Sequence, residues 1–293
     1  MSVFIAVAEE ESFAGGARRL AMSAPAVTRA VAALEGRLGV KLLDRTTRHV
    51  RVTEAGQRYL EDARRAVVAA DEADEAAAGL NRQPRGHLTV TAPVLFGRMH
   101  AMPVIVEYLR THPETTLTAI LLDRVVNMLE EGVDVGIRIG ELPDSSFKAR
   151  LVGHVRRVVC ASPDYLARNG EPMKPEDLAG HSIIVASGLS PTVQWRFARD
   201  GAPVSVRVAP RLTVTSNDAA IEAAVSGIGI TRLMSYQIGP QLDSGRLQVV
   251  LAGYEPARVP IHVLHREGRN PSAKVRSFVD LIVERLRANV DFA

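Results

Sequence analysis

The fold of the N-terminal part is decided by residues 12–38, SFAGGARRLAMSAPAVTRAVAALEGRL. Ser12 is a good N-cap for one helix, and Ser23 for a longer helix that tolerates Pro25 in its first turn. Gly39 supplies a stop at the end of this second helix. Two short helices joined by a turn of three residues have the dimensions of a helix-turn-helix.

The segments on either side complete a small basic domain. Residues 1–11 are expected to form a preceding helix, and residues 40–52 alternate like a short hairpin, which would be a wing. Residues 12–58 contain nine basic and three acidic side chains, a net charge of +6, whereas the whole chain carries +3. The positive charge is therefore concentrated at the N-terminal end, as expected for a domain that meets an anionic partner.

The second helix of the pair has one apolar face and one small, polar face. Val27, Val31 and Leu34 share the apolar face, which leaves Thr28 and Arg29 on the other. A hydroxyl and a guanidinium among small residues suit the DNA major groove, and flanking arginines suit phosphate contacts. We predict that DNA is contacted by Arg18, Ser23, Ala24, Pro25, Ala26, Thr28, Arg29, Arg45, Arg48 and Arg51. The alternative is that these arginines only solvate a helical bundle.

A long helix is expected to begin after Thr53 and to continue to about Leu80. Along it Tyr59 and a series of alanines recur with a period of about 3.5 residues. Because alanine lets two helices approach closely, a dimerising pair is favoured over a solitary, solvated helix. The predicted domains are a DNA-binding domain at 1–58, a linker and dimerisation helix at 59–85, and a C-terminal domain at 86–293.

From residue 88 onward, apolar strands alternate with helices, which predicts an α/β domain with largely parallel sheets. Strands are expected at 88–92, 116–122, 133–139, 157–161, 182–186, 211–215 and 259–265. Helices are expected at 95–110, 125–130, 163–168, 218–225, 235–242 and 272–287. A length of 293 residues is compatible with two or three compact units.

Ordered motifs in the first part of the chain resemble the N-terminal signature of LysR-type transcriptional regulators. The matching motifs are SFA, ARRL, MSAPAVTR, LE, LG, LLDR and VTEAG, at residues 12–14, 17–20, 22–29, 34–35, 38–39, 42–45 and 52–56. Looser matches are TAP, HP, EGVDVGIRIG, ASPDYL and GIGI, at residues 91–93, 112–113, 131–140, 161–166 and 227–230. The resemblance implies a winged helix-turn-helix, a linker helix used for dimerisation, and a C-terminal effector domain built like a periplasmic binding protein.

The same resemblance implies partners and an arrangement of the effector domain. The expected partners are double-stranded promoter or operator DNA, a small-molecule effector, further copies of the chain in a homodimer or homotetramer, and RNA polymerase. No cofactor is implied. The effector domain is expected to consist of subdomain I (86–160 and 266–293) and subdomain II (161–265), joined by strand crossings near residues 160 and 265.

An effector cleft is expected between these subdomains, because ligands of open α/β sheets lie at the carboxyl ends of strands, where helix N-termini point their amides. The residues assigned to it are Ala92, Pro93, Val94, Leu95, Phe96, Asp123, Arg124, Arg138, Ser187, Trp195, Ser216 and Asn217. Such a cleft favours a small aromatic or carboxylated molecule. For Arg138 an ion pair with Asp134 or Glu141 is an alternative, and for Trp195 a place in the core.

Three features depart from the family pattern. Met1 falls within what resembles the first helix, so we expect an earlier turn to be missing. Gly15 and Gly16 replace the usual alanines of the second helix, at a cost of about 1 kcal/mol each unless close packing offsets it. Ala24 stands where relatives often carry glutamine, so that base readout depends more on Arg29, its neighbours and DNA shape.

Other classes of protein receive little support from the sequence. Apolar stretches are too short to span a membrane, and residues 9–11, all glutamate, interrupt the start before a signal peptide forms, which predicts a cytoplasmic protein. Cys160, the one cysteine, lies in an apolar run and is expected to be a buried thiol. The eight histidines show no metal-ligand spacing, and phosphate-loop, nucleophile-elbow and zinc motifs are absent, so neither a metal nor a catalytic residue is predicted. The rival hypothesis is a solute-binding or enzymatic α/β protein with an accessory helical domain.

Overall fold

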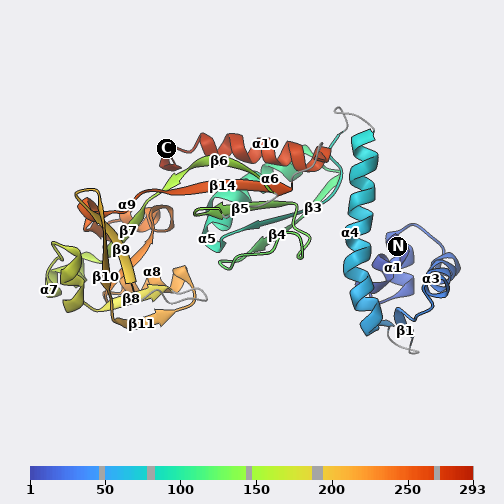
Figure 1. The fold of residues 1–293 in the computed structure, drawn as a ribbon, viewed down its shortest axis with the longest axis horizontal. Coiled ribbons are helices and arrows are strands. Elements are labelled where there is room, and N and C mark those ends of the chain that lie inside the picture. Colours follow the sequence, from blue (N-terminus) through green and yellow to red (C-terminus); the bar gives the residue numbers. More distant parts are fainter. Residues whose placement is uncertain (46–49, 78–82, 143–146, 187–193, 267–270, 293) are drawn as a thin grey trace. The chain divides into compact units, whose positions relative to one another are not determined.

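The computed structural model describes residues 1–45, 50–77, 83–142, 147–186, 194–266 and 271–292 (Figure 1). The chain divides into two compact units, Met1–Arg82 and Gln83–Ala293. Each unit has a hydrophobic core of its own.

The first unit is a helical bundle with a two-stranded wing. Its elements are α1 (Ser2–Glu9), α2 (Phe13–Arg19), α3 (Ala24–Leu38), β1 (Leu43–Arg45), β2 (Val50–Val52) and α4 (Glu54–Ala77). Strands β1 and β2 pair antiparallel. The predicted helix-turn-helix, wing and long helix are therefore confirmed.

Local chemistry at the helix ends explains where α2 and α3 begin and end. The Ser12 hydroxyl accepts a hydrogen bond from the backbone N–H of Gly15 at 3.2 Å, which caps α2. Ser23 is the N-cap residue of α3, but its side chain makes no capping hydrogen bond within the described residues. Gly39 ends α3 with a φ of +70°, in the left-handed region that favours glycine.

The two glycines in α2 have a packing role. Gly15 and Gly16 belong to α2, and both are buried where α2 packs on α1. A Cβ added at Gly16 would lie 2.8 Å from Val7 Cγ2 and 3.1 Å from Val7 Cα, and one added at Gly15 would lie 2.8 Å from Glu10 Cβ. The absent side chains therefore let α1 and α2 approach closely, and this packing offsets the low helix propensity of glycine.

The start of the alanine seam on α4 packs within the first unit. The Tyr59 ring lies 5.7 Å from that of Phe4, and Ala63 is only 1% exposed. Further along the helix, Ala66 and Ala70 are exposed. The side chains of residues 71–77 lie outside the described part of the chain, so only this first stretch of the seam is placed.

The first half of the second unit is a five-stranded sheet in the order β4-β3-β5-β14-β6. Its strands are β3 (Gly86–Ala92), β4 (Thr115–Leu121), β5 (Val135–Ile139), β6 (Phe147–Val155) and β14 (Val259–Arg266). After β3, α5 (Val94–Phe96), a π-helical turn (Gly97–Ala101) and α6 (Met102–Thr111) follow without a break. Helices α6 and α10 (Ala273–Arg287) pack on this sheet and on each other (Figure 1).

The second half is a five-stranded sheet in the order β11-β8-β12-β7-β13, with a separate hairpin, β9–β10. Its elements are β7 (Arg157–Ala161), α7 (Pro163–Asn169), β8 (Ile183–Ala186), β9 (Gln194–Arg199), β10 (Ala202–Arg207), β11 (Pro210–Val214), α8 (Asn217–Val225), β12 (Ile230–Met234), α9 (Gly239–Asp243) and β13 (Gln248–Val250). Helix α8 packs on one face of the sheet. Trp195 and Phe197 of the hairpin pack with sheet residues such as Val159 and Ile230 in a second hydrophobic core.

The sheets correct several expectations. Both are mixed rather than largely parallel, because β14 pairs antiparallel with β5 and β6, and β7 pairs antiparallel with β12 and β13. Strands β6, β9, β10 and β13 were not predicted, and residues 125–130 form no helix, since only 128–130 are in a turn. The chain crosses between the sheets after β6 and before β14, so β7 lies wholly in the second sheet and β14 wholly in the first, unlike the expected crossings near residues 160 and 265.

Candidate functional site

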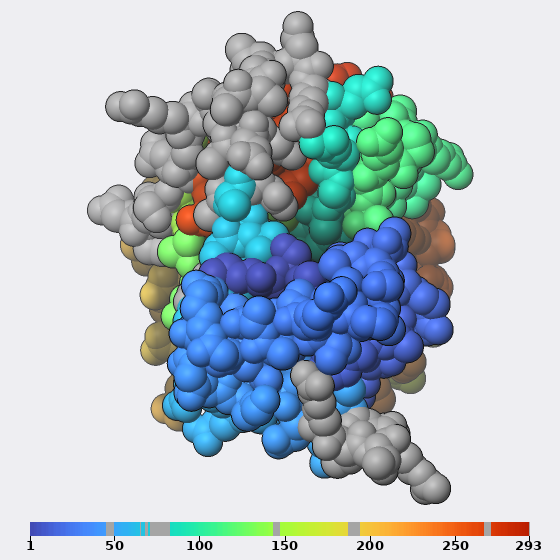
Figure 2. All heavy atoms as spheres, turned by 90° about the vertical axis from the view of Figure 1, so that its right-hand side faces the viewer, coloured from blue at the N-terminus to red at the C-terminus, as the bar shows by residue number. Residues whose placement is uncertain are grey.

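The N-terminal half of α3 presents a small, open surface on the first unit. Four of the residues predicted to contact DNA are exposed there, namely Ser23, Ala24, Pro25 and Arg29. Two others, Ala26 and Thr28, are half-buried. The Thr28 hydroxyl donates to the carbonyl oxygen of Ala24 at 3.0 Å, which orients it and leaves its oxygen available as an acceptor. Figure 2 views the first unit from the side on which α3 lies in Figure 1, and the blue atoms form a continuous surface there.

The orientation of this surface is fixed by the opposite face of α3. Val27 and Val31 are fully buried and Leu34 is 8% exposed, packed in one cluster with Phe4 of α1 and Leu60 of α4. Because the apolar residues recur at helical spacing, burying them turns Arg29 outward. The structure thus confirms the division of α3 into two faces.

Glu35, whose role sequence reasoning missed, fastens α3 to the wing. Its side chain is 3% exposed and accepts hydrogen bonds from the backbone N–H groups of Leu42 at 2.9 Å and Leu43 at 3.1 Å, while its other oxygen lies 2.9 Å from Lys41 Nζ. Burial would raise the pKa of this carboxyl group, but the hydrogen bonds from Lys41 and the two amides outweigh it, so the pKa lies below its ordinary value. The charged carboxylate therefore sets where the wing leaves the helix.

The predicted phosphate-contacting arginines are only partly described. Arg18 and Arg51 are exposed, and neither forms an ion pair with another described residue. Arg48 lies outside the described residues, as does the side chain of Arg45. Arg19 is used internally, since its Nη1 lies 2.6 Å from Glu9 Oε2, and Glu9 also binds Arg64 of α4 at 2.6 Å.

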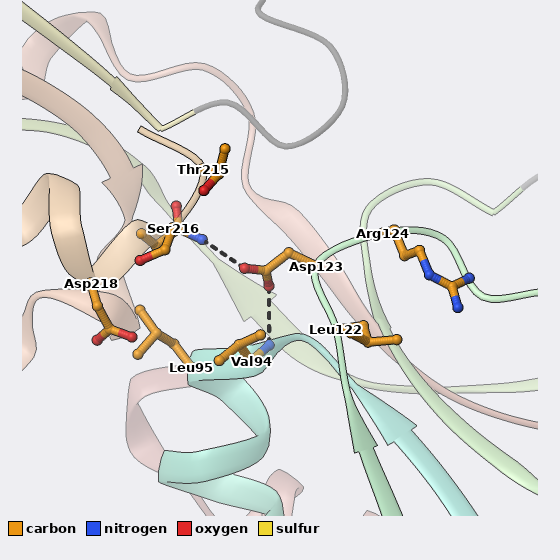
Figure 3. A pocket seen from close by; sticks show the side chains of 9 residues that line it. Val94, Leu95, Leu122, Asp123, Arg124, Thr215, Ser216 and Asp218 are labelled. Carbon is orange, nitrogen blue, oxygen red and sulfur yellow. Dashed lines mark hydrogen bonds between the residues drawn. The ribbon is translucent and has the colours of Figure 1, made fainter. Parts of the chain in front are cut away.

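In the second unit, a cavity of about 350 Å³ opens between the ends of strands from both sheets (Figure 3). It is lined by Val94, Leu95, Leu122, Asp123, Arg124, Thr215, Ser216, Asn217 and Asp218. Helices α5 and α8 both begin at this cavity, at Val94 and Asn217. The Ser216 hydroxyl caps α8 by accepting from the N–H of Ala219 at 3.2 Å.

Asp123 stands at the centre of the lining and joins the two halves of the unit. One carboxylate oxygen accepts from the backbone N–H of Val94 at 3.0 Å, and the other accepts from the Asn217 side-chain amide at 3.4 Å (Figure 3). Asp123 therefore occupies the helix-end amide that a carboxylated ligand would use.

The arginines near the cavity also have internal partners. Arg124 forms two hydrogen bonds with Glu131, at 2.7 and 2.8 Å. Arg138 donates from Nη2 to the carbonyl oxygen of Val126 at 2.8 Å, and burial lowers its pKa. Neither expected ion pair of Arg138, with Asp134 or Glu141, occurs as a salt bridge in the described part of the chain. Because Arg98 binds Asp218 at 3.3 Å, Asp123 is the lining carboxylate without a cationic partner among the described residues.

The structure brings together only some of the residues assigned to the effector. Val94, Leu95, Asp123, Arg124, Ser216 and Asn217 line the cavity, whereas Ala92, Pro93, Phe96, Arg138 and Trp195 do not. Phe96 is fully buried and stacks on Phe292, and Trp195 is 3% exposed in the second core, the alternative considered for it. Ser187 lies outside the described residues.

Sequence reasoning missed Leu122, Thr215 and Asp218 as lining residues. Each is the immediate neighbour of a residue that was assigned to the cleft. The signal was therefore present, because a loop that turns at a strand end exposes consecutive residues to the same cavity. Which neighbours face inward depends on backbone torsions that a one-dimensional pattern does not specify.

Cys160 is fully buried, as predicted, and burial raises the pKa of its thiol to about 12. Within the described ranges, no three histidine, cysteine, aspartate or glutamate side chains are grouped so that they would hold a metal ion. None of the helices in the described part of the chain has the length and apolar character needed to span a bilayer.

Two family models match the chain. The bacterial regulatory helix-turn-helix protein, lysR family, matches residues 1–57, and the LysR substrate binding domain matches residues 81–287. An HTH-type transcriptional regulator of Xanthomonas campestris pv. campestris is 35% identical, with 99% of this chain and 86% of that protein covered. The HTH-type transcriptional regulator CrgA of Neisseria meningitidis serogroup B is 30% identical, with 99% and 97% covered.

Solved full-length structures are similar as well. The structure of CrgA, a LysR-type transcriptional regulator from Neisseria meningitidis, matches with a TM-score of 0.64 and 30% identity, covering 98% of this chain and 97% of that one. The Vibrio cholerae virulence activator AphB, a member of the LTTR protein family, matches with a TM-score of 0.63 and 26% identity, covering 96% of each chain. The similarity therefore extends over both units.

Proposed function

This chain belongs to the LysR family of transcriptional regulators, and we propose that it regulates promoters by placing the exposed half of α3 in the DNA major groove under the control of a small molecule bound beside Asp123. The observation that carries the proposal is the surface of α3, where Arg29 and Thr28 stand among small residues on a helix whose opposite face is buried. A mobility-shift assay on DNA upstream of its own or a divergent gene tests it. Salt-sensitive binding is expected, and absence of binding by the full-length protein contradicts the proposal.

The division of labour between base readout and phosphate contact gives a sharper test. Replacing Arg29 with alanine is expected to lower the preference for the operator over random DNA by about tenfold, because a lost base contact costs about 1–3 kcal/mol. Replacing Arg51 with alanine should weaken binding to both DNAs alike and reduce the salt slope by about one. Both quantities follow from fluorescence anisotropy titrations at several salt concentrations. Equal effects of the two substitutions on operator and random DNA would show that α3 is misassigned.

The effector is proposed to bind in the cavity around Asp123. A ligand there touches residues from both halves of the unit, and it would compete with the bridge from Asp123 to Val94 and Asn217. A bound ligand therefore has a physical means of changing how the halves are joined, since the bridge and the ligand use the same polar groups. Because Asp123 has no cationic partner among the described residues, it favours effectors that present a hydrogen-bond donor or a positive charge over effectors that present a carboxylate.

Replacement of Asp123 by asparagine tests this preference. The substitution keeps the size and an acceptor oxygen but removes the charge, so affinity for a carboxylic acid should rise relative to the amide of the same skeleton by about tenfold or more. Thermal-shift titrations with matched acid and amide pairs measure the ratio, because a ligand of the folded state raises its stability. A ratio that is the same in wild type and variant would mean that Asp123 does not face the ligand.

Self-association and a contact with RNA polymerase complete the proposal. The exposed alanines Ala66 and Ala70 of α4 support a helix pair between two copies, since small side chains let helices approach closely. The RNA polymerase contact is carried over from the family. We assign no catalytic activity, and the curated relatives, which are named transcriptional regulators, support this assignment.

A further inference from the structure

A cluster of arginines lies on the second sheet and its hairpin, and none of these arginines is among the residues that line the cavity. In the antiparallel pairing of β7 with β12, Arg232 is opposite Val159 and Met234 is opposite Arg157. Because alternate residues of a strand share a face, Arg157 and Arg232 lie on the face of Val159, which packs in the core with Trp195. This is the face opposite Val158 and Cys160, which belong to the core that includes α8.

The hairpin β9–β10 completes the cluster. The Arg232 guanidinium carbon lies 5.0 Å from the centre of the Trp195 ring, and Nη1 donates to the backbone carbonyl oxygen of Arg196 at 3.2 Å. Trp195 is 3% exposed, Arg157 and Arg232 are half-buried, and Arg196 is exposed. The Arg232 guanidinium is thus held between the sheet and the hairpin, while Arg157 is half-buried on the same sheet face and Arg196 is exposed on the hairpin.

These arginines differ from their neighbours in having no acidic partner among the described residues. Arg156, next in the chain to Arg157, lies 3.0 Å from Glu255, and Arg199 of the same hairpin lies 2.7 Å from Glu176. Burial, together with repulsion from Arg157 and Arg196, lowers the pKa of Arg232 to about 9. Burial and repulsion from Arg196 also lower the pKa of Arg157. Within the described part of the chain, no carboxylate is therefore paired with Arg157, Arg196 or Arg232 to offset the repulsion among them.

We propose that Arg157, Arg196 and Arg232 bind a compact, multivalent oxyanion, a phosphate group or a dicarboxylate, at a second ligand site distinct from the cavity around Asp123. Guanidinium groups donate in a planar fork that matches both kinds of anion, and an anion among three of them relieves their repulsion. A small anion fits better than an extended acidic surface, because Arg157 and Arg232 are half-buried and only Arg196 is exposed.

The test is a thermal-shift titration of the full chain with inorganic phosphate, and in parallel with succinate, at constant ionic strength. Wild type should show a saturable rise in Tm with at least one of the two anions, and the responding anion identifies the class. Arg157→Gln and Arg232→Gln should each weaken the apparent affinity by about tenfold or more, because a charge-assisted hydrogen bond is lost. Arg110→Gln, at an exposed position on α6, serves as the control and should titrate like wild type.

A second readout separates a ligand site from a merely structural role. Without added anion, Arg157→Gln should melt at or above the Tm of wild type. The substitution removes repulsion between Arg157 and the other two arginines, and it breaks no ion pair within the described residues. A lower Tm without anion, the same saturable shift in wild type and in both cluster variants, or no saturable shift with either anion would overturn the proposal. If Arg157→Gln weakens DNA binding while wild type shows no anion-dependent shift, the cluster contacts DNA instead.

Discussion

Replacing Glu35 with alanine is expected to destabilise the junction of α3 and the wing by about 2–4 kcal/mol, because two buried backbone amides then lose their acceptor. Those amides belong to Leu42 and Leu43, and the same carboxylate also binds Lys41. Hydrogen exchange of peptides covering residues 41–44 in the full chain measures the effect directly. Glutamine at this position keeps one acceptor oxygen, so Glu35→Gln should cost about 1 kcal/mol.

The control for this prediction is Glu61→Ala, at an exposed position on α4, which should leave exchange at the wing unchanged. Since the pKa of Glu35 is lowered by folding, its stabilising contribution is complete above the ordinary carboxyl pKa of about 4.3 and is lost as the pH falls through the lower folded value. The difference in protection between wild type and Glu35→Gln should therefore shrink as the pH drops below about 4. Unchanged protection in Glu35→Ala at neutral pH would show that the carboxylate does not hold the wing.

Replacing Gly56 with alanine is expected to destabilise the first unit by about 2–3 kcal/mol through overpacking. Gly56 is buried in the first turn of α4, and an added Cβ would overlap the carbonyl oxygen of Leu42 and lie 2.8 Å from Val52 Cγ1. That carbonyl also accepts a hydrogen bond from the N–H of Thr53 at 3.0 Å, so moving it away would break a second contact. The expected result is a lower melting temperature for the helical transition and weaker DNA binding.

Gly36→Ala is the matched control, because the same methyl group is added in the same unit at a different place. Gly36 lies within α3, and apart from the neighbouring backbone of its own helix, no heavy atom of the described residues lies within 4 Å of its added Cβ. Alanine there should stabilise the helix by about 0.5–1 kcal/mol, since it loses less backbone entropy on folding. The two substitutions therefore have opposite signs, and destabilisation by both or neither would contradict the packing argument.

The sequence predicts the first unit almost completely. Helix boundaries there are set by local signals, such as Ser12 as a cap and Gly39 in the left-handed conformation. The alternation of apolar and polar residues along α3 also determines which face is buried, so the candidate DNA surface follows from the pattern. Such signals act over a few residues, so they can be recognised from the sequence alone.

The second unit is predicted less well. The alternation of strands and helices indicates the α/β class. It does not indicate strand direction, because a buried strand has the same apolar composition whether its neighbour runs parallel or antiparallel. The unpredicted strand β6 pairs along nearly the whole of β14, and that pairing joins residues more than a hundred positions apart in the chain. Residues 125–130 have a helical composition and yet form no helix, and helix propensity is a weak guide for so short a segment.

The sequence by itself determined the family, the helix-turn-helix and the approximate ends of the strands that surround the cavity, because motifs and periodicities are local. The tertiary structure decided which polar groups already have partners. Asp123 occupies the amide at Val94, Glu131 binds Arg124, and Glu35 holds the wing. Pairings of this kind depend on distances between segments that are separated in the sequence or joined by a turn. Only the folded chain fixes those distances.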